Sequence, residues 1–365
     1  MKKSFDMTDR RNFLKAWTAA VAGMLASPFL DATARGAVKE SSGRLSGSRL
    51  IVPEAAVPIT GTFLDEITHD IPHQNWGEKE WDRDFRYMKA IGITDVIDIR
   101  CGYRKYLTYP SPYLLKKGCF MPSVDLIDMF CRLAEKHGMR FWFGLYDTGV
   151  KYPEGAALDI ENNRFVIDEA WEMYGKKYKS FAGWYLSKEV SPRSKGLIES
   201  YHALGKQCKD LSGGLPVFIS PYMDGKRTYD DFSGPKIRNF GSNMAEHEST
   251  WDEIFSGIHD VVDACAFQDG LIAVDEYDDF LSVNKQLTDK YGMASWTNAE
   301  TFDRDMPIHF FPIAFENLRL KLEAAKRCGY DKAITFEFSH FMSPQSAYLQ
   351  AGHLYNRYKE YFGIR

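Results

Sequence analysis

The sequence lacks the short motifs that mark many metal-binding and nucleotide-binding proteins. Its 6 cysteines are scattered, with no C-x-x-C pair and no zinc-ligand spacing. Its 9 histidines form neither an H-E-x-x-H nor an H-x-H motif. No glycine-rich phosphate-binding loop follows the first apolar run, because Gly61 stands alone there. We therefore expect neither a resident metal nor a cofactor.

The chain also has no excess of positive charge and no long apolar run. The net charge is −4 and the sequence pI is about 6.2, so the chain has no basic surface for nucleic acid. The longest mildly apolar run, residues 16–30, is shorter than the ~20 residues that a membrane span needs. Nucleic acid and the membrane interior are thus not expected partners.

The N-terminal segment has the pattern of an export signal. A charged start containing Arg10-Arg11 precedes the apolar run, and the small residues Ala32-Thr33-Ala34 follow it. The paired arginines before Phe13-Leu14-Lys15 resemble a bacterial twin-arginine leader. We predict a signal peptide over residues 1–34, a linker over 35–55 and one catalytic domain over 56–365. Such a leader implies an exported, periplasmic protein.

The rest of the chain alternates apolar, β-rich runs with amphipathic helical segments. Several helical segments end in a glycine that leads into the next strand, as in Ala90-Ile91-Gly92-Ile93 and Lys136-His137-Gly138-Met139. Strand starts recur roughly every 30 to 45 residues, which is typical of βα units. The predicted strands are 59–67, 95–100, 140–147, 181–187, 216–222, 263–269, 293–298 and 332–338.

Eight strand–helix units predict an α/β fold, a single-domain (β/α)8 TIM barrel. A doubly wound open sheet is the alternative, but it favours a glycine-rich loop after the first strand, which is missing. The polar stretch 224–259 predicts an extended loop over the fifth strand.

Acidic and other polar residues follow almost every predicted strand. In a TIM barrel these positions meet at one face, where active sites lie. Holding so many acidic groups together in one mouth costs electrostatic free energy. Proteins tolerate that cost where a polar ligand must be held or where pKa values must be shifted. The candidate site residues are Glu66, Arg100, Tyr103, Asp147, Glu189, Tyr222, Asp269, Asn298, Glu300, Glu337 and His340.

Two of these acids carry a family resemblance. Glu189 and Glu300, after the fourth and seventh strands, resemble the catalytic pair of clan A glycoside hydrolases. The chain from Gly61 to Tyr361 also resembles a bacterial barrel family described only as glycoside hydrolases, on the evidence of Gly61-Thr62-Phe63 and Gly183-Trp184-Tyr185 among others.

The resemblance implies a retaining glycoside hydrolase acting on carbohydrate. It makes Glu189 the acid/base and Glu300 the nucleophile. One position departs from the clan pattern. Lys188 stands where the clan has asparagine, and a lysine close to Glu189 would disfavour its acid form.

Tryptophans are candidate platforms for sugar rings. Trp184 and Trp296 lie within strands, where each could instead face the barrel interior or the helices. Trp76 lies in the polar loop after the first strand, where it has little core to fill. We expect all three to contact the carbohydrate.

Two other functions remain open. Glu66, Asp269 and Glu337, with the proposed pair and with His69 and His340, could ligate a divalent ion in a sugar isomerase or epimerase. Alternatively, Lys188 could mark a barrel that binds carbohydrate without cleaving it. The sugar, the linkage and the oligomeric state cannot be predicted from the sequence.

Overall fold

The computed structural model describes residues 55–365 except 69–70, 192–193, 228–243 and 304–309. The predicted signal peptide and all but the last residue of the predicted linker lie outside these residues.

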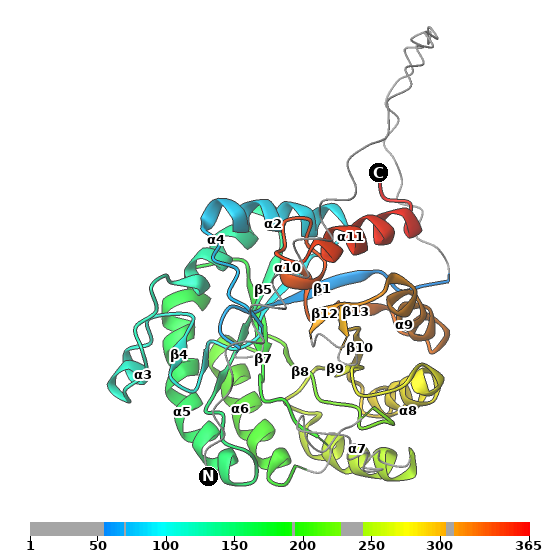
Figure 1. Cartoon of the computed structure of the whole chain (residues 1–365). Helices are drawn as coiled ribbons and strands as arrows, with labels where there is room; N and C mark the ends of the chain where they lie inside the picture. The colour runs from blue at the N-terminus through cyan, green and yellow to red at the C-terminus, as the bar shows by residue number, and fades with distance from the viewer. Residues whose placement is uncertain (1–54, 69–70, 192–193, 228–243, 304–309) are drawn as a thin grey trace, which may run out of the picture. The chain divides into compact units, whose positions relative to one another are not determined.

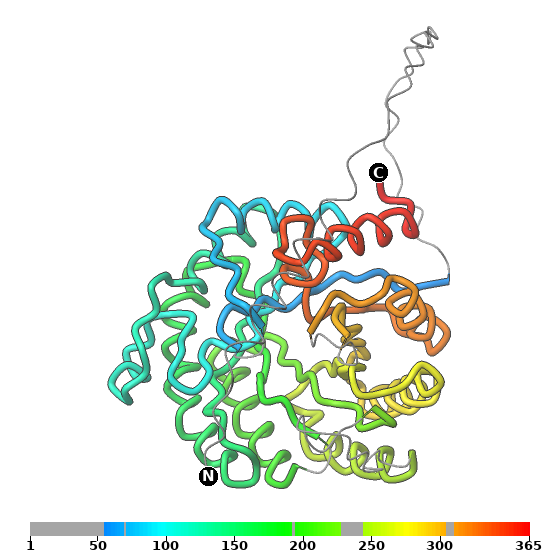
Figure 2. The backbone as a smooth tube through the Cα atoms, in the orientation of Figure 1, coloured from blue at the N-terminus to red at the C-terminus, as the bar shows by residue number. Residues whose placement is uncertain are grey.

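Eight parallel strands close into a barrel, as predicted, and helices surround it (Figure 1). The order around the barrel is β1-β13-β10-β9-β8-β7-β5-β2, so each strand lies beside its neighbour along the chain and β13 returns to β1. The backbone therefore winds once around a common axis (Figure 2). The barrel strands are β1 (Ile59–Leu64), β2 (Asp95–Asp98), β5 (Arg140–Gly144), β7 (Phe181–Tyr185), β8 (Val217–Ile219), β9 (Ala264–Gln268), β10 (Ala294–Asn298) and β13 (Lys332–Thr335).

The larger helices follow the strands and cover the outside of the barrel. They are α2 (Glu78–Ala90), α4 (Leu126–His137), α5 (Glu154–Ala170), α6 (Leu197–Ser212), α7 (Met244–Ile258), α8 (Tyr277–Lys290), α9 (Phe315–Arg327) and α11 (Leu349–Tyr361). Shorter elements lie in the loops: β3 (Gly102–Tyr103), β4 (Tyr106–Leu107), α3 (Pro112–Lys116), β6 (Tyr146–Asp147), the π-helical turn Trp171–Gly175, the 3-10 turn Val274–Glu276, β11 (Phe302–Asp303), β12 (Phe311–Pro312) and α10 (Phe338–Phe341).

The strands are buried on both faces, which is why they read as apolar runs. Val96 packs in the core between the barrel and its helices, whereas its neighbour Ile97 packs in a second core inside the barrel. Glycine is required where strands approach closely. A Cβ on Gly144 would lie 2.1 Å from the carbonyl oxygen of Asp98.

The stretch 224–259 does not form one extended loop, and that prediction was wrong. Its second half is helix α7, whose buried residues recur at helical spacing: His247, Trp251, Ile254, Phe255 and Ile258. The polar residues between them hid the pattern. Residues 228–243 of this stretch lie outside the described part.

A polar cluster closes the end of the barrel at which the strands begin. The Asp95 carboxylate accepts hydrogen bonds from Trp142 Nε1, Arg140 Nη2 and Lys332 Nζ, each at 2.8 Å. The Lys332 ammonium also lies 4.0 Å from the centre of the Trp296 ring. Because Trp142 and Trp296 fill this end of the barrel, we expect the functional face at the opposite end, where the strands end.

Among the residues that the structure describes, no helix has both the length and the apolar character to cross a membrane.

Candidate active site

A small cavity lies at the face where the barrel strands end. Its volume is about 70 Å³, and both glutamates of the predicted pair line it. The chain places Glu189 after β7 and Glu300 after β10, and the closed barrel brings them to one mouth. The lining residues are Phe63, Thr68, Ile99, Arg100, Glu189, Tyr222, Gln268, Asn298, Glu300, Phe302, Phe310 and Phe336.

Three donors surround the carboxyl group of Glu189. Arg100 Nη2 lies 3.3 Å from Oε2, and the Tyr222 hydroxyl donates to the same oxygen at 3.2 Å. Gln268 Nε2 donates to Oε1 at 3.3 Å. These three contacts fix the orientation of the carboxyl group at the mouth. Gln268 was not among the predicted site residues, although it directly precedes Asp269 at the end of β9.

The Lys188 ammonium pairs with other acids and not with Glu189, so the sequence-based expectation that it disfavours the acid form of Glu189 does not apply. Its ammonium lies 2.7 Å from Asp147 Oδ1 and 3.4 Å from Asp159 Oδ2, and it donates to the Val150 carbonyl at 2.9 Å. Successive residues after a strand point to different sides, so a lysine next to Glu189 in sequence is not next to it in space.

Asp147 joins this lysine to the arginine of the mouth. Its Oδ2 lies 3.4 Å from Arg100 Nη1. Burial opposes the charge on Arg100, but the carboxylates of Glu189, Asp65 and Asp147 outweigh it and raise the pKa of the guanidinium. Asp147 is absent from the cavity lining, so it positions Arg100 rather than meeting a ligand in the cavity.

The backbone of Glu300 is held in place by the buried ion pair between Asp269 and Lys321. Glu300 is 1% exposed, and its backbone N–H donates to Asp269 Oδ1 at 3.1 Å. Lys321 of α9 donates to the same carboxylate oxygen at 2.7 Å and to the Glu300 carbonyl at 3.1 Å. Burial raises the pKa of Asp269, with Lys321 opposing the rise. The expectation that Asp269 binds substrate gives way to a positioning role, since it does not line the cavity.

Lys321 itself was missed by the sequence analysis. The available signal was a lysine on the buried face of a helix, beside Leu318 and Leu322. A buried lysine needs a partner of opposite charge, and the acid after β9 is that partner.

Glu337 and His340 form a structural cap beside the mouth. The Glu337 carboxylate accepts from the backbone N–H groups of Ser339 and His340 at the start of α10, and it contacts the His340 ring. His340 Nε2 lies 2.8 Å from the Pro72 carbonyl oxygen. Burial opposes protonation of His340, but Glu337 outweighs it and raises the pKa of the ring to about 9. Neither residue lines the cavity, so their predicted contact with substrate is not supported.

Two further predicted residues have clear partners. Asn298 lines the cavity; its Nδ2 donates to Ser220 Oγ at 3.2 Å and its Oδ1 accepts from the Phe336 N–H at 3.1 Å. Tyr103 lies beneath the Arg100 guanidinium, 5.2 Å from its ring centre. It contributes to the mouth through Arg100 and does not line the cavity.

The prediction for two tryptophans was wrong. Trp184 is fully buried between the barrel and its helices, with its ring centre 5.0 Å from that of Phe181. Trp296 lies at the far end of the barrel, 5.6 Å from the ring of Trp142. Because both faces of a barrel strand are buried, the sequence could not fix which way either ring points.

Trp76 and Glu66 lie in a cleft next to the mouth, which we call the β1–β2 cleft. It has a volume of about 860 Å³. It lies between the loop after β1 and the segment that leads from β4 to α4. Its lining residues are Glu66, Ile67, His73, Asn75, Trp76, Gly77, Glu78, Trp81, Tyr106, Leu107, Phe120, Met121, Pro122, Ser123, Val124, Asp125, Leu126, Asp128, Met129 and Arg132.

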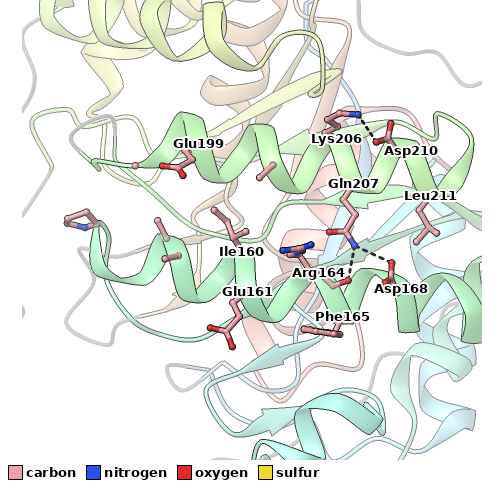
Figure 3. Close-up of a pocket in the computed structure, with 15 residues that line it drawn as sticks. Ile160, Glu161, Arg164, Phe165, Asp168, Glu199, Lys206, Gln207, Asp210 and Leu211 are labelled. Carbon is pink, nitrogen blue, oxygen red and sulfur yellow. Dashed lines mark hydrogen bonds and ion pairs between the residues drawn. The ribbon is translucent and has the colours of Figure 1, made fainter.

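A larger cavity, about 1380 Å³, lies elsewhere, in the groove between α5 and α6 on the outer helix layer (Figure 3). Gln207 crosses this groove and donates to the Arg164 carbonyl at 2.7 Å and to Asp168 at 3.2 Å. Charges of both signs line it, and no residue of the barrel mouth does. Within the described residues, no group of three or more histidines, cysteines or acids has the arrangement of a metal site.

Fold and site together define a TIM barrel with two acids at its mouth, and the comparisons place this barrel in a family. The chain matches the family described as "Domain of unknown function (DUF4434)" over residues 59–348, and it belongs to that family. The expected likeness to a bacterial barrel family is thereby confirmed. No curated protein matches the chain.

Two solved structures show how far the likeness extends. A Bacteroides thetaiotaomicron protein, whose crystal structure is described as that of a "putative alpha-L-fucosidase", is 66% identical. The match covers 88% of this chain and 100% of that one, with a TM-score of 0.83. The endo-1,4-beta-mannanase from Rhizomucor miehei is 10% identical over 82% of this chain and 90% of its own, with a TM-score of 0.51, which shows a shared fold.

Proposed function

We propose that this protein is a glycoside hydrolase that uses the carboxyl groups of Glu189 and Glu300. The observation that supports this most directly is that both glutamates line one cavity at the functional end of the barrel. Cleaving a glycosidic bond needs a proton on the leaving oxygen and negative charge against the sugar ring. Two carboxyl groups at one mouth can supply both.

The substrate class comes from the relative of high identity. Because a 66% identical protein is described as a "putative alpha-L-fucosidase", α-L-fucosides are the first substrates to test. Arg100, Tyr222 and Asn298 line the cavity and offer hydrogen-bonding groups to sugar hydroxyls. The non-catalytic alternative loses its main support, since Lys188 faces Asp147 rather than Glu189.

The direct experiment measures hydrolysis of 4-nitrophenyl glycosides, beginning with the α-L-fucoside, by wild type, Glu189→Gln and Glu300→Gln. We expect each variant to lose on the order of 10²- to 10⁴-fold in kcat because a proton-transfer or charge-stabilising group is removed. Glu172→Gln is the matched control, since Glu172 is exposed on the outer surface. Full activity in Glu300→Gln would remove Glu300 from the mechanism.

The contacts of Glu189 support a division of roles opposite to the one that the resemblance implies. Arg100 and two hydrogen-bond donors, Tyr222 and Gln268, hold the carboxyl group of Glu189 in one position, as a nucleophile requires. We therefore propose Glu189 as the nucleophile and Glu300 as the acid/base of a retaining reaction.

Chemical rescue by azide tests this assignment. Azide replacing a lost nucleophile yields a glycosyl azide of inverted configuration, whereas azide replacing a lost acid/base yields one of retained configuration. We expect the inverted product from Glu189→Gly and the retained product from Glu300→Gly, as read by proton NMR. The reverse pattern would restore the division that the resemblance implies.

A further inference from the structure

The β1–β2 cleft is larger than the cavity at the mouth and opens beside it. The mouth cavity has a volume of about 70 Å³ and the cleft about 860 Å³. Ligand pockets commonly measure ~300–1,000 Å³. The loop after β1 borders both, because Thr68 lines the cavity and Glu66 and Ile67 line the cleft. The cleft is therefore a candidate binding volume for a part of the substrate that extends beyond the mouth.

Exposed apolar side chains gather on one wall of the cleft. Tyr106 is 59% exposed, Phe120 52%, Met121 65% and Val124 51%. The rings of Tyr106 and Phe120 meet edge to face at 5.5 Å, and the Lys105 ammonium lies 5.8 Å from the centre of the Phe120 ring. On the other wall, Trp76 is fixed edge to face on the buried Trp81 at 5.1 Å. A contiguous exposed apolar patch of this kind marks a binding surface.

The floor of the cleft carries a polar group suited to a hydroxyl-rich ligand. The Glu66 side chain is 3% exposed, and its Oε2 lies 3.1 Å from His73 Nε2. Its Oε1 is buried and has no hydrogen bond of normal geometry within the described part of the chain. Burial raises the pKa of Glu66 to about 8, with His340 opposing the rise, so near neutral pH the group can donate as well as accept.

We propose that the β1–β2 cleft binds a second sugar unit of an oligosaccharide substrate, with the rings of Trp76 and Phe120 against its C–H face and Glu66 on its hydroxyls. This inference rests on the proposed function. A sugar ring offers both an apolar face and hydroxyl groups, which matches the two kinds of surface in the cleft.

The charges in the cleft favour a neutral sugar over a uronic acid or a sulfated sugar. Arg132 lines the cleft, but it already pairs with Glu78 at 2.7 Å and with Asp128 at 2.9 Å. Asp125 also lines the cleft and would repel an anionic ligand when ionised.

The test measures binding apart from turnover. The full chain carrying Glu300→Gln is applied to an array of neutral oligosaccharides, and the dissociation constant of the strongest binder is measured by calorimetry. Phe120→Ala and Tyr106→Ala are then added singly. The matched control is Phe165→Ala, because Phe165 is 50% exposed on α5 and lies in the groove between α5 and α6.

We expect Phe120→Ala and Tyr106→Ala each to weaken binding by on the order of tenfold, and Phe165→Ala to leave it unchanged. The proposal is overturned if no oligosaccharide binds, or if all three variants bind as tightly as their parent. Binding that depends on Phe120 without any hydrolysis by wild type would sink the proposed function and leave the cleft proposal standing. Hydrolysis by wild type, together with oligosaccharide binding that Phe120→Ala leaves unchanged, would support the proposed function and overturn the cleft proposal.

Discussion

At the scale of single residues, Arg100 decides the electrostatics of the barrel mouth. It is 4% exposed and connects the carboxylates of Glu189 and Asp147. Its Nε is buried and finds no hydrogen-bond partner among the residues that the structure describes. A planar guanidinium can face two carboxylates at once, which a lysine ammonium does less well. The sequence placed Arg100 at the mouth but gave no sign that its main partner lies two strands away.

We expect Arg100→Met to lower kcat/KM by on the order of 10²-fold, since a buried ion pair loses one partner. The loss should appear mainly in kcat, because Arg100 lies against the carboxyl group of Glu189. Steady-state kinetics on the α-L-fucoside would measure it. Arg104→Met is the control, because Arg104 also lies over Tyr103 but does not line the cavity. An Arg100→Met variant as active as wild type would show that Arg100 does not act through Glu189.

At the scale of elements, buried hydrogen bonds connect helix α2 to the segment that follows strand β13. Asp84 of α2 is fully buried and accepts hydrogen bonds from the hydroxyls of Ser339 and Ser343 and from Gln345 Nε2. Burial raises the pKa of Asp84 to about 7, with the serine hydroxyls opposing the rise. This contact holds α2 against the segment whose first residue, Glu337, caps α10.

Asp84→Ala should lower the free energy of unfolding by about 3 kcal/mol, because it leaves the two buried hydroxyls of Ser339 and Ser343 without an acceptor and removes one of the acceptors of Gln345. Asp84→Asn keeps an acceptor and should cost less than half as much. Urea unfolding followed by circular dichroism would measure both values. A loss below about 0.5 kcal/mol for the alanine variant would mean that water replaces the carboxylate.

Much of the element pattern could be predicted from the sequence, and the failures have a common cause. Apolar runs at regular spacing predicted all eight barrel strands, because a parallel barrel buries both faces of each strand. The same burial removes the alternation that shows which face points inward. Trp184 and Trp296 were therefore both placed at the mouth, although one packs under the helices and the other fills the far end.

At the scale of the whole molecule, the closed barrel makes the site. Glu189 and Glu300 could be predicted because residues that end parallel strands meet at one face. Their surroundings could not, since Gln268, Asp269 and Lys321 reach them from other strands or from the helix layer. Spacing along the chain carries no information about such partners.

The stability of the whole barrel should fall in acid because His247 is buried in its neutral form. Its Nε2 lies 2.7 Å from Asn284 Oδ1, and burial lowers its pKa to about 4. The unfolded chain takes up a proton near pH 6.5, which the native ring resists, so this contribution is present above that pH and is lost as the pH falls toward 4.

We expect proton uptake by His247 in the unfolded chain to lower the free energy of unfolding by about 2 kcal/mol between pH 7 and pH 5. His247→Gln can still donate to Asn284 but has no charge to gain, so the loss over this interval should be smaller by about that amount. Urea unfolding at the two pH values gives the comparison, with His202→Gln as the control, because the His202 side chain is 43% exposed. If wild type and His247→Gln lost stability equally between pH 7 and pH 5, the buried histidine would not be the acid-sensitive group of this barrel.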